Sequence, residues 1–231
     1  DRRSFDPPPT FSHGKQSSEV RVRDGQFELV TLGLEGRQAF PLARVLGVDP
    51  LRQFIVAEPR GRYQVTELAT DARTNDWFDV YVDEDRQPGE WGHWTGRGMT
   101  WNTMCAFGHN TRVRKNYDFN SDTFNAVFKE HGVGCESCHG PLADHNAWQQ
   151  ARGGKQKGDP TLRRLDKRRT LDYCGACHAR RNDLTGDFHP GQQFFDHYLL
   201  TIPDDTDTFF PDGQVRDENF EFTAFLGSRM H

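Results

Sequence analysis

Cysteine and histidine recur with one fixed spacing at two places in the second half of the chain. The stretches are CESCH, which begins at Cys135, and CGACH, which begins at Cys174. Two thiols three positions apart can each add to a vinyl group on one edge of a porphyrin, and the adjacent imidazole can then bind the iron. The spacing therefore predicts two covalently attached haems c. The predicted thioether residues are Cys135, Cys138, Cys174 and Cys177, and the predicted proximal ligands are His139 and His178.

A third stretch, MCAFGHN, keeps the first cysteine and the histidine of this pattern but has Gly108 where the second cysteine would stand. The separation from Cys105 to His109 equals that in the complete motifs. We therefore predict a third haem, held by one thioether from Cys105, with His109 as its proximal ligand. The alternative is a lost site, in which Cys105 is a free thiol or pairs with a partner chain.

Other uses of paired cysteines fit less well. A zinc ribbon has two C-x-x-C pairs roughly 15 to 20 residues apart, and here the pairs are much further apart, each with its own histidine. A thioredoxin-like pair usually lies in a βαβ unit, and no run of strand-forming residues precedes either pair. A disulfide framework is disfavoured because the chain has five cysteines, an odd number. Haem attachment remains the preferred interpretation.

Seven histidines remain as candidates for the distal side of the iron: His13, His93, His131, His145, His189, His197 and His231. His93 lies between two tryptophans in WGHW, which indicates an apolar setting. His145 is too close in sequence to His139 to reach the far face of that haem easily, so it is expected to ligate a neighbouring iron. His197 lies between FFD and YLL, and Asp196 is a candidate to orient its ring. These three are the leading distal candidates, followed by His231 and His13.

The elements that position these residues change in character along the chain. Between about Glu19 and Val82, alternating runs such as EVRVRDGQFELV, RQFIVA, RYQVTEL and WFDVYV are separated by turn residues, which is typical of antiparallel strands. From about His93 onward the strand signal fades, and all the cysteines and nine of the ten histidines appear. We predict an α+β protein, with a β-rich domain without haem at 1–90 and a helix-and-loop multihaem cytochrome c domain at 91–231. The stretch 161–181 is expected to be helical into its cysteine pair.

Composition limits the classes of function. The formal net charge of −5 does not favour nucleic-acid binding, and no apolar run is long enough to span a membrane. Haem is attached to cysteine outside the cytoplasm, so we expect an exported protein, periplasmic or extracellular, whose leader has been removed. The basic run at 151–181 is either a solvated face, a neutralising surface for haem propionates or a docking surface for an acidic partner.

Several of these stretches together resemble the bacterial multihaem cytochrome c-554-like proteins, which often carry C-terminal tetratricopeptide repeats. The stretches are HWTGRGMTWNTMC, RKNYD, GVGCESCHGP, CGACHARR and FFDHYLL, with FSHG, RVRDGQFEL and GVDPLRQFIV nearer the start. The resemblance implies His93, His145 and His197 as distal ligands. Relatives carry cysteine at the position of Gly108 and continue past FLGSRMH into another haem motif. We therefore expect the chain to be a fragment, or a short version, of a longer protein.

Bis-histidine ligation would make the protein an electron carrier, because both axial positions of the iron are then occupied and no site is open to substrate. It would exchange electrons with redox partner proteins or with further copies of itself, as a soluble relay or as a unit of a wire-like assembly. The competing hypothesis is a haem enzyme, a small-molecule reductase or oxidase with one open iron site. A haem-based sensor is the third hypothesis.

Overall fold

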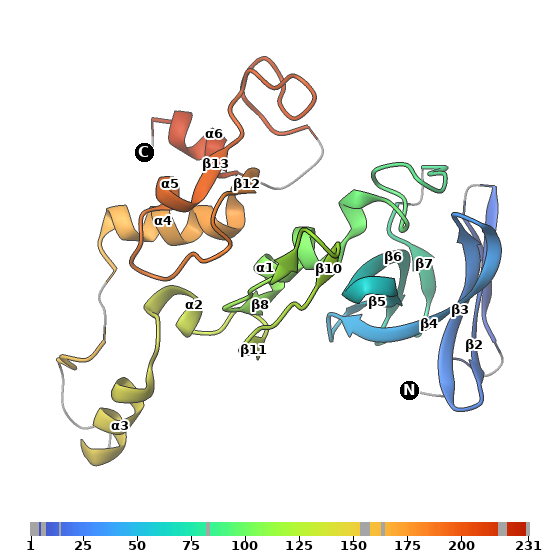
Figure 1. Ribbon diagram of the computed structural model, residues 1–231, viewed down its shortest axis with the longest axis horizontal. Helices are drawn as coiled ribbons and strands as arrows, with labels where there is room; N and C mark the ends of the chain where they lie inside the picture. Colours follow the sequence, from blue (N-terminus) through green and yellow to red (C-terminus); the bar gives the residue numbers. More distant parts are fainter. Residues whose placement is uncertain are drawn as a thin grey trace. The chain divides into compact units, whose positions relative to one another are not determined.

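The structure is a computed structural model that describes residues 5, 8–13, 15–81, 84–152, 158–162, 165–216 and 221–229 (Figure 1). The chain divides into two compact units. Unit 1 contains Asp1–Ala106 and Tyr117–Ala126, and unit 2 contains Phe107–Asn116 and Val127–His231.

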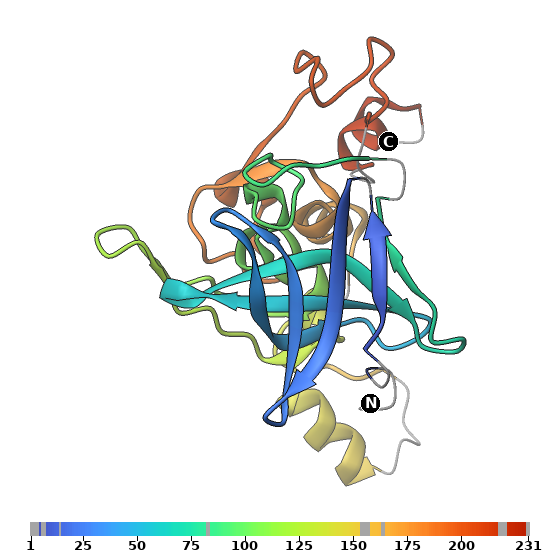
Figure 2. The ribbon, with the colours of Figure 1, turned by 90° about the vertical axis from the view of Figure 1, so that its right-hand side faces the viewer.

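Unit 1 is built on one antiparallel sheet of seven strands, each paired with its neighbours in chain order. The strands are β1 (Thr10–His13), β2 (Gln16–Arg23), β3 (Gln26–Gly33), β4 (Gly36–Leu46), β5 (Leu51–Glu58), β6 (Arg62–Asp71) and β7 (Trp77–Asp79). The sheet curls until β1 and β7 contact each other, so it is nearly a barrel. Figure 2 shows the first strands crossing those of β4 to β6 at a steep angle. Register shifts in β4 and β5 supply part of the bend, because bulges increase twist.

The N-terminal antiparallel sheet predicted from the alternating runs is confirmed. The run EVRVRDGQFELV forms β2 and β3, and the turn between them is Asp24-Gly25. Both turn residues have positive φ, 51° and 81°, as the commonest two-residue hairpin turn requires. The inward side chains form a core of Phe5, Val20, Leu29, Phe54 and Leu68, against which Trp77 packs.

The stretch before Cys105 is held against β6 by buried polar contacts within unit 1. The Gln64 side chain donates to the carbonyls of Trp94 and Gly96. The Asn102 amide donates to the Gly61 carbonyl and accepts from the Tyr63 backbone N–H. These contacts help to bury β6, and they fix the position of the chain just before Cys105.

Unit 2 is built from short helices and two-stranded ladders. Its helices are α2 (Glu136–His139), α3 (Ala143–Arg152), α4 (Lys167–His178), α5 (Phe194–His197) and α6 (Phe222–Gly227). Its ladders pair β8 (Asn110–Thr111) with β11 (Glu130–His131) and β12 (Arg181–Asp183) with β13 (Tyr198–Leu200). Helix α1 (Ala106–His109) begins at the last residue of unit 1's first segment, and β9 (Tyr117–Asp118) pairs with β10 (Thr123–Phe124) in unit 1.

The core of unit 2 gathers around α4. Its buried members are Ala176, Ala179, Phe194, Tyr198 and Phe222. Within the predicted helical stretch 161–181, the helix extends over Lys167–His178 and so runs through the cysteine pair. It begins after Asp166, whose side chain caps it by accepting from the Arg169 backbone N–H. No helix in the described part of the chain is long and apolar enough to cross a bilayer.

Candidate haem attachment sites

Each complete C-x-x-C-H motif ends a helix. Cys135 caps α2, whose last residue is His139, and α4 runs through Cys174 to its last residue, His178. Helical side chains three and four positions apart lie on one face, so the two thiols and the imidazole of each motif face the same way. Gly140 ends α2 with φ 76° and ψ −164°, a conformation that is open essentially only to glycine.

All five thiols are free, and in each complete motif the second is less exposed than the first. Cys135 and Cys174 are exposed, whereas Cys138 and Cys177 are only partly exposed. Burial raises the pKa of both Cys138 and Cys177. The Cys174 thiol raises the pKa of Cys138 further, and Cys138 raises that of Cys177. The complete motifs of α2 and α4 therefore lie close to each other within unit 2.

The first motif has a different local structure. A π-helical turn at Trp101–Cys105 leads into α1, which ends at the exposed His109. Burial raises the pKa of the Cys105 thiol to about 11. A Cβ added at Gly108 would meet nothing within 4 Å, and the φ of Gly108 is not in the left-handed region. No backbone requirement accounts for the glycine, and a side chain would fit there.

Within unit 2, the α4 motif contacts Phe107 of the incomplete motif. The Cys177 thiol lies 3.6 Å from the backbone carbonyl of Phe107 and can donate to it, and the Arg181 guanidinium lies 5.5 Å from the centre of the Phe107 ring. Phe107 lies between Cys105 and His109, so the chain of the incomplete motif borders the α4 motif within unit 2.

These thiols suit haem attachment better than a structural zinc ion. No disulfide joins any of the five cysteines. In the part of the chain that the structure describes, no three His, Cys, Asp or Glu side chains converge as metal ligands. Two free thiols followed directly by a histidine are what covalent haem attachment uses. Haem c would be held by Cys135, Cys138 and His139 at one site and by Cys174, Cys177 and His178 at the other.

The leading distal candidates share one feature. Their ring Nδ1 atoms contact an oxygen of another side chain: Thr95 at 2.8 Å for His93, Asp159 at 2.5 Å for His145 and Thr185 at 2.6 Å for His197. An iron-ligating histidine commonly donates from its other ring nitrogen, which fixes the tautomer and the ring orientation. The contacts of His145 and His197 are compatible with this role, whereas Nδ1 of His93 also accepts from the Thr95 backbone N–H at 3.2 Å. For His197, the partner is Thr185 instead of the predicted Asp196.

The surroundings of these three histidines differ. His93 is fully buried in unit 1, with the Trp94 ring centre 6.1 Å away. His145 lies on α3 and contacts Asp159. Burial raises the pKa of Asp159, but hydrogen bonds from Thr161 and His145 outweigh it, so this pKa is lowered overall. His197 ends α5 and packs edge-on against Phe188.

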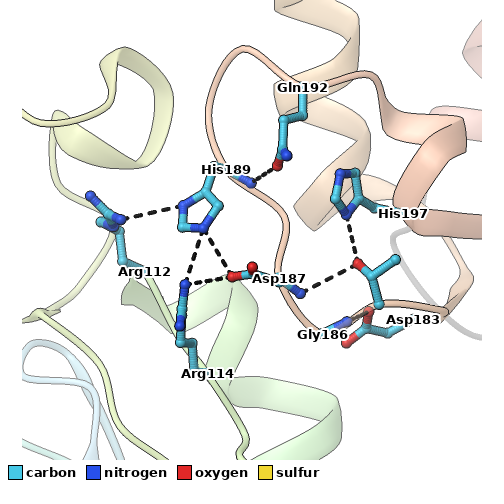
Figure 3. A network of polar contacts seen from close by, with 9 residues as sticks. Arg112, Arg114, Asp183, Gly186, Asp187, His189, Gln192 and His197 are labelled. Carbon is cyan, nitrogen blue, oxygen red and sulfur yellow. Dashed lines mark hydrogen bonds and ion pairs between the residues drawn. The ribbon is translucent and has the colours of Figure 1, made fainter.

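The remaining candidate histidines have different surroundings, and one of them is not described by the structure. His13 lies in β1, where it pairs with Gln16 through the backbone, and the prediction for His231 lies outside the described residues. His131 is exposed in β11, with its ring 4.8 Å from that of Phe128. His189 has both ring nitrogens occupied: Nδ1 by Arg112 at 3.3 Å, and Nε2 by Asp187 at 2.9 Å and Arg114 at 3.1 Å (Figure 3).

The polar network of Figure 3 is the part of unit 2 that sequence reasoning did not find. Its members come from two stretches, Arg112 to Arg114 and Asp183 to His197, that are far apart in the chain. The basic run predicted at 151–181 does not include any of these residues, and no local pattern points to His189. The Thr185 partner of His197 likewise has no local signal.

Residues 87–140 match the protein-family model described as cytochrome c554 and c-prime. The matched stretch contains His93, the incomplete motif and the whole of CESCH, and it ends before the α4 motif. No curated protein and no solved structure matches the chain significantly. The family match supports a c-type cytochrome of the cytochrome c554-like group, with haem c as the implied cofactor and electron transfer as the implied activity.

Proposed function

We propose that the protein is a multihaem c-type cytochrome that carries electrons through closely spaced bis-histidine haems. The observation that carries this proposal is the Nδ1 contact that His145 and His197 share. Each of these two contacts can orient the imidazole so that Nε2 is the nitrogen to bind iron. His93 is proposed on the sequence resemblance, since its Nδ1 accepts from the Thr95 backbone N–H. Iron with two imidazole ligands exchanges electrons without binding substrate, so the protein acts as a relay or as one unit of a longer wire.

We assign three haems to the chain, all within 91–231, and none to the β-rich part at 1–90. Two are held by the complete motifs, and the third is held by the single thioether of Cys105 with His109 as proximal ligand. The contacts of Phe107 with Cys177 and Arg181 support this third site, because they place the incomplete motif beside a complete one. His13 and His231 are the further distal candidates.

The cellular setting follows from the chemistry of the cofactor. Haem c is joined to cysteine outside the cytoplasm, so the protein is exported and works in the periplasm or at the cell exterior. Its partners are redox proteins or further copies of itself.

Intact mass under denaturing conditions tests the number of haems directly. The expected result is three haems, one of them bound through a single thioether. Alkylation must follow denaturation, because a buried thiol with a pKa of about 11 would react slowly in the folded chain even if it were free. Two haems and an alkylated Cys105 would remove the third site.

The visible spectrum with and without carbon monoxide separates the carrier from the enzyme. Six-coordinate haems are low-spin and do not respond to the gas. A high-spin fraction that binds carbon monoxide would instead favour a small-molecule reductase or oxidase with one open iron site.

Single replacements of His93, His145 and His197 by Ala test the distal assignment. Each is expected to raise the reduction potential of one haem or to open it to added ligands. His131→Ala is the matched control, since this histidine is exposed and its ring packs on Phe128. If all three variants titrate like the control, other residues ligate the irons.

A further inference from the structure

A pocket of about 300 Å³ in unit 2 has a basic side and an apolar side. Its basic side chains are Arg112, Arg114 and Lys129, and the polar lining also includes Asp187 and His189. Its apolar walls are Val113, Val127, Phe128 and Phe188. The pocket begins three residues after His109, so it borders the chain that follows the incomplete motif.

Backbone hydrogen bonds hold two of the three stretches of this pocket together, 112–114 and 127–129. Arg114 and Val127 exchange two backbone hydrogen bonds of 2.8 Å, and the Lys129 N–H donates to the Thr111 carbonyl. Arg112 has a φ of 54°, in the left-handed region that long side chains seldom occupy. Such backbone strain clusters at ligand-binding sites, and here it occurs at a residue that lines the pocket.

The charges in the pocket do not balance. His189 lies between the two arginines. Its Nδ1 is 3.3 Å from the Arg112 guanidinium, and its Nε2 is 3.1 Å from the Arg114 guanidinium and 2.9 Å from an Asp187 oxygen (Figure 3). Asp187 pairs with Arg114. Among the described residues, no carboxylate lies within ion-pair distance of Arg112 or Lys129.

We propose that this pocket is an anion site for carboxylates carried on an apolar body, and that the propionates of a haem in the same unit fill it. The two cations without a carboxylate partner match the two negative charges of a haem's propionates, and the apolar walls suit a porphyrin edge better than a hydrated ion. That a haem supplies the carboxylates rests on the proposed function, whereas the ability of the pocket to bind an anion does not depend on it.

Reduction potentials of the loaded protein test the propionate assignment. Arg112→Gln and Lys129→Gln each remove a cation that disfavours the ferric state, so the potential of one haem should fall while the others stay unchanged. We expect about a tenfold change in its oxidised-to-reduced ratio, equivalent to about 59 mV for one electron. Lys129 is exposed, so its replacement should leave folding intact. Arg216→Gln is the control, because Arg216 lies outside the pocket, against Phe210.

Calorimetric titration with inorganic phosphate separates the two sources of anion. No saturable phosphate binding, together with the shifted potential, supports the propionate assignment. Saturable binding that both variants lose, with unchanged potentials, would keep the anion site but overturn the propionate as its ligand. Variants that match the parent in both measurements, or a shift shared by Arg216→Gln, would overturn the site. Since phosphate binding needs no haem, and mass counts the haems separately, failure of the proposed function would be recognised as such.

Discussion

The complete motifs and the incomplete one differ in which position of the motif the protein covers. In the motifs of α2 and α4 the first thiol is exposed and the second is partly covered. In the first motif the thiol of Cys105 is covered enough to raise its pKa to about 11, while the fourth position, Gly108, is exposed and open. The comparison shows that the missing cysteine is the one that would have stood in open space.

The turn before Cys105 distinguishes the incomplete motif from the motif of α4. A π-helical turn holds one more residue than an α-helical turn, so it rotates the face that the following residues present. Cys105 is the last residue of such a turn, whereas Cys174 follows regular α-helix. With the same C-x-x-x-H spacing, the residues of the incomplete motif therefore turn a different face of the helix toward the protein.

Removal of the thiols tests whether both kinds of motif attach haem, and it has the largest expected effect. Cys105→Ser should lower the number of covalent haems by one, as should the double variant Cys135→Ser with Cys138→Ser. Denaturing mass spectrometry gives the number directly. Gly108→Ala is the matched control, because a methyl group there meets nothing within 4 Å. If Cys105→Ser keeps the parent's number of haems, the first motif is not an attachment site.

Asn102→Ala should destabilise unit 1 and disturb only the first motif. The buried Asn102 amide satisfies the Gly61 carbonyl and the Tyr63 N–H, and leaving buried partners unsatisfied costs about 1–3 kcal/mol each. We expect the free energy of unfolding to fall by about 2–3 kcal/mol in a urea titration. Thr103→Ala, at a neighbouring exposed position, should change it little. An equal loss in both variants would contradict a specific role for Asn102.

The parts of this architecture that the sequence predicts are the local ones. Alternation in EVRVRDGQFELV predicts β2 and β3 because the burial period of a strand is two, and Asp24-Gly25 predicts the turn because both residues tolerate positive φ. The contact of β1 with β7 and the partner of His197 depend on tertiary packing. No local pattern encodes such contacts, so the sequence suggests the adjacent Asp196, whereas the structure places Thr185 at Nδ1 of His197.

Asp159→Asn should raise the reduction potential of one haem, a smaller effect than loss of a haem. A carboxylate that accepts from an axial imidazole makes the ligand more basic and favours ferric iron, so its neutralisation favours the ferrous state. Potentials from a spectroelectrochemical titration measure the change, which we expect to be on the order of a tenfold shift in the oxidised-to-reduced ratio, about 59 mV. Asp144→Asn removes the same charge next to His145 in sequence and is the control. Equal shifts in both variants would indicate a general charge effect.

Gly108→Cys should complete the first motif and produce the smallest change. The added Cβ has open space, and the backbone φ suits an ordinary side chain, so the thiol can be introduced without strain. A second thioether removes the remaining vinyl from conjugation with the porphyrin, so the absorption band of this haem should move slightly to shorter wavelength while the haem number stays the same. Gly108→Ser is the control, since it adds a side chain of similar size that cannot form a thioether. A parent-like spectrum, with the introduced thiol still open to alkylation after denaturation, would show that the vinyl lies out of reach of this position.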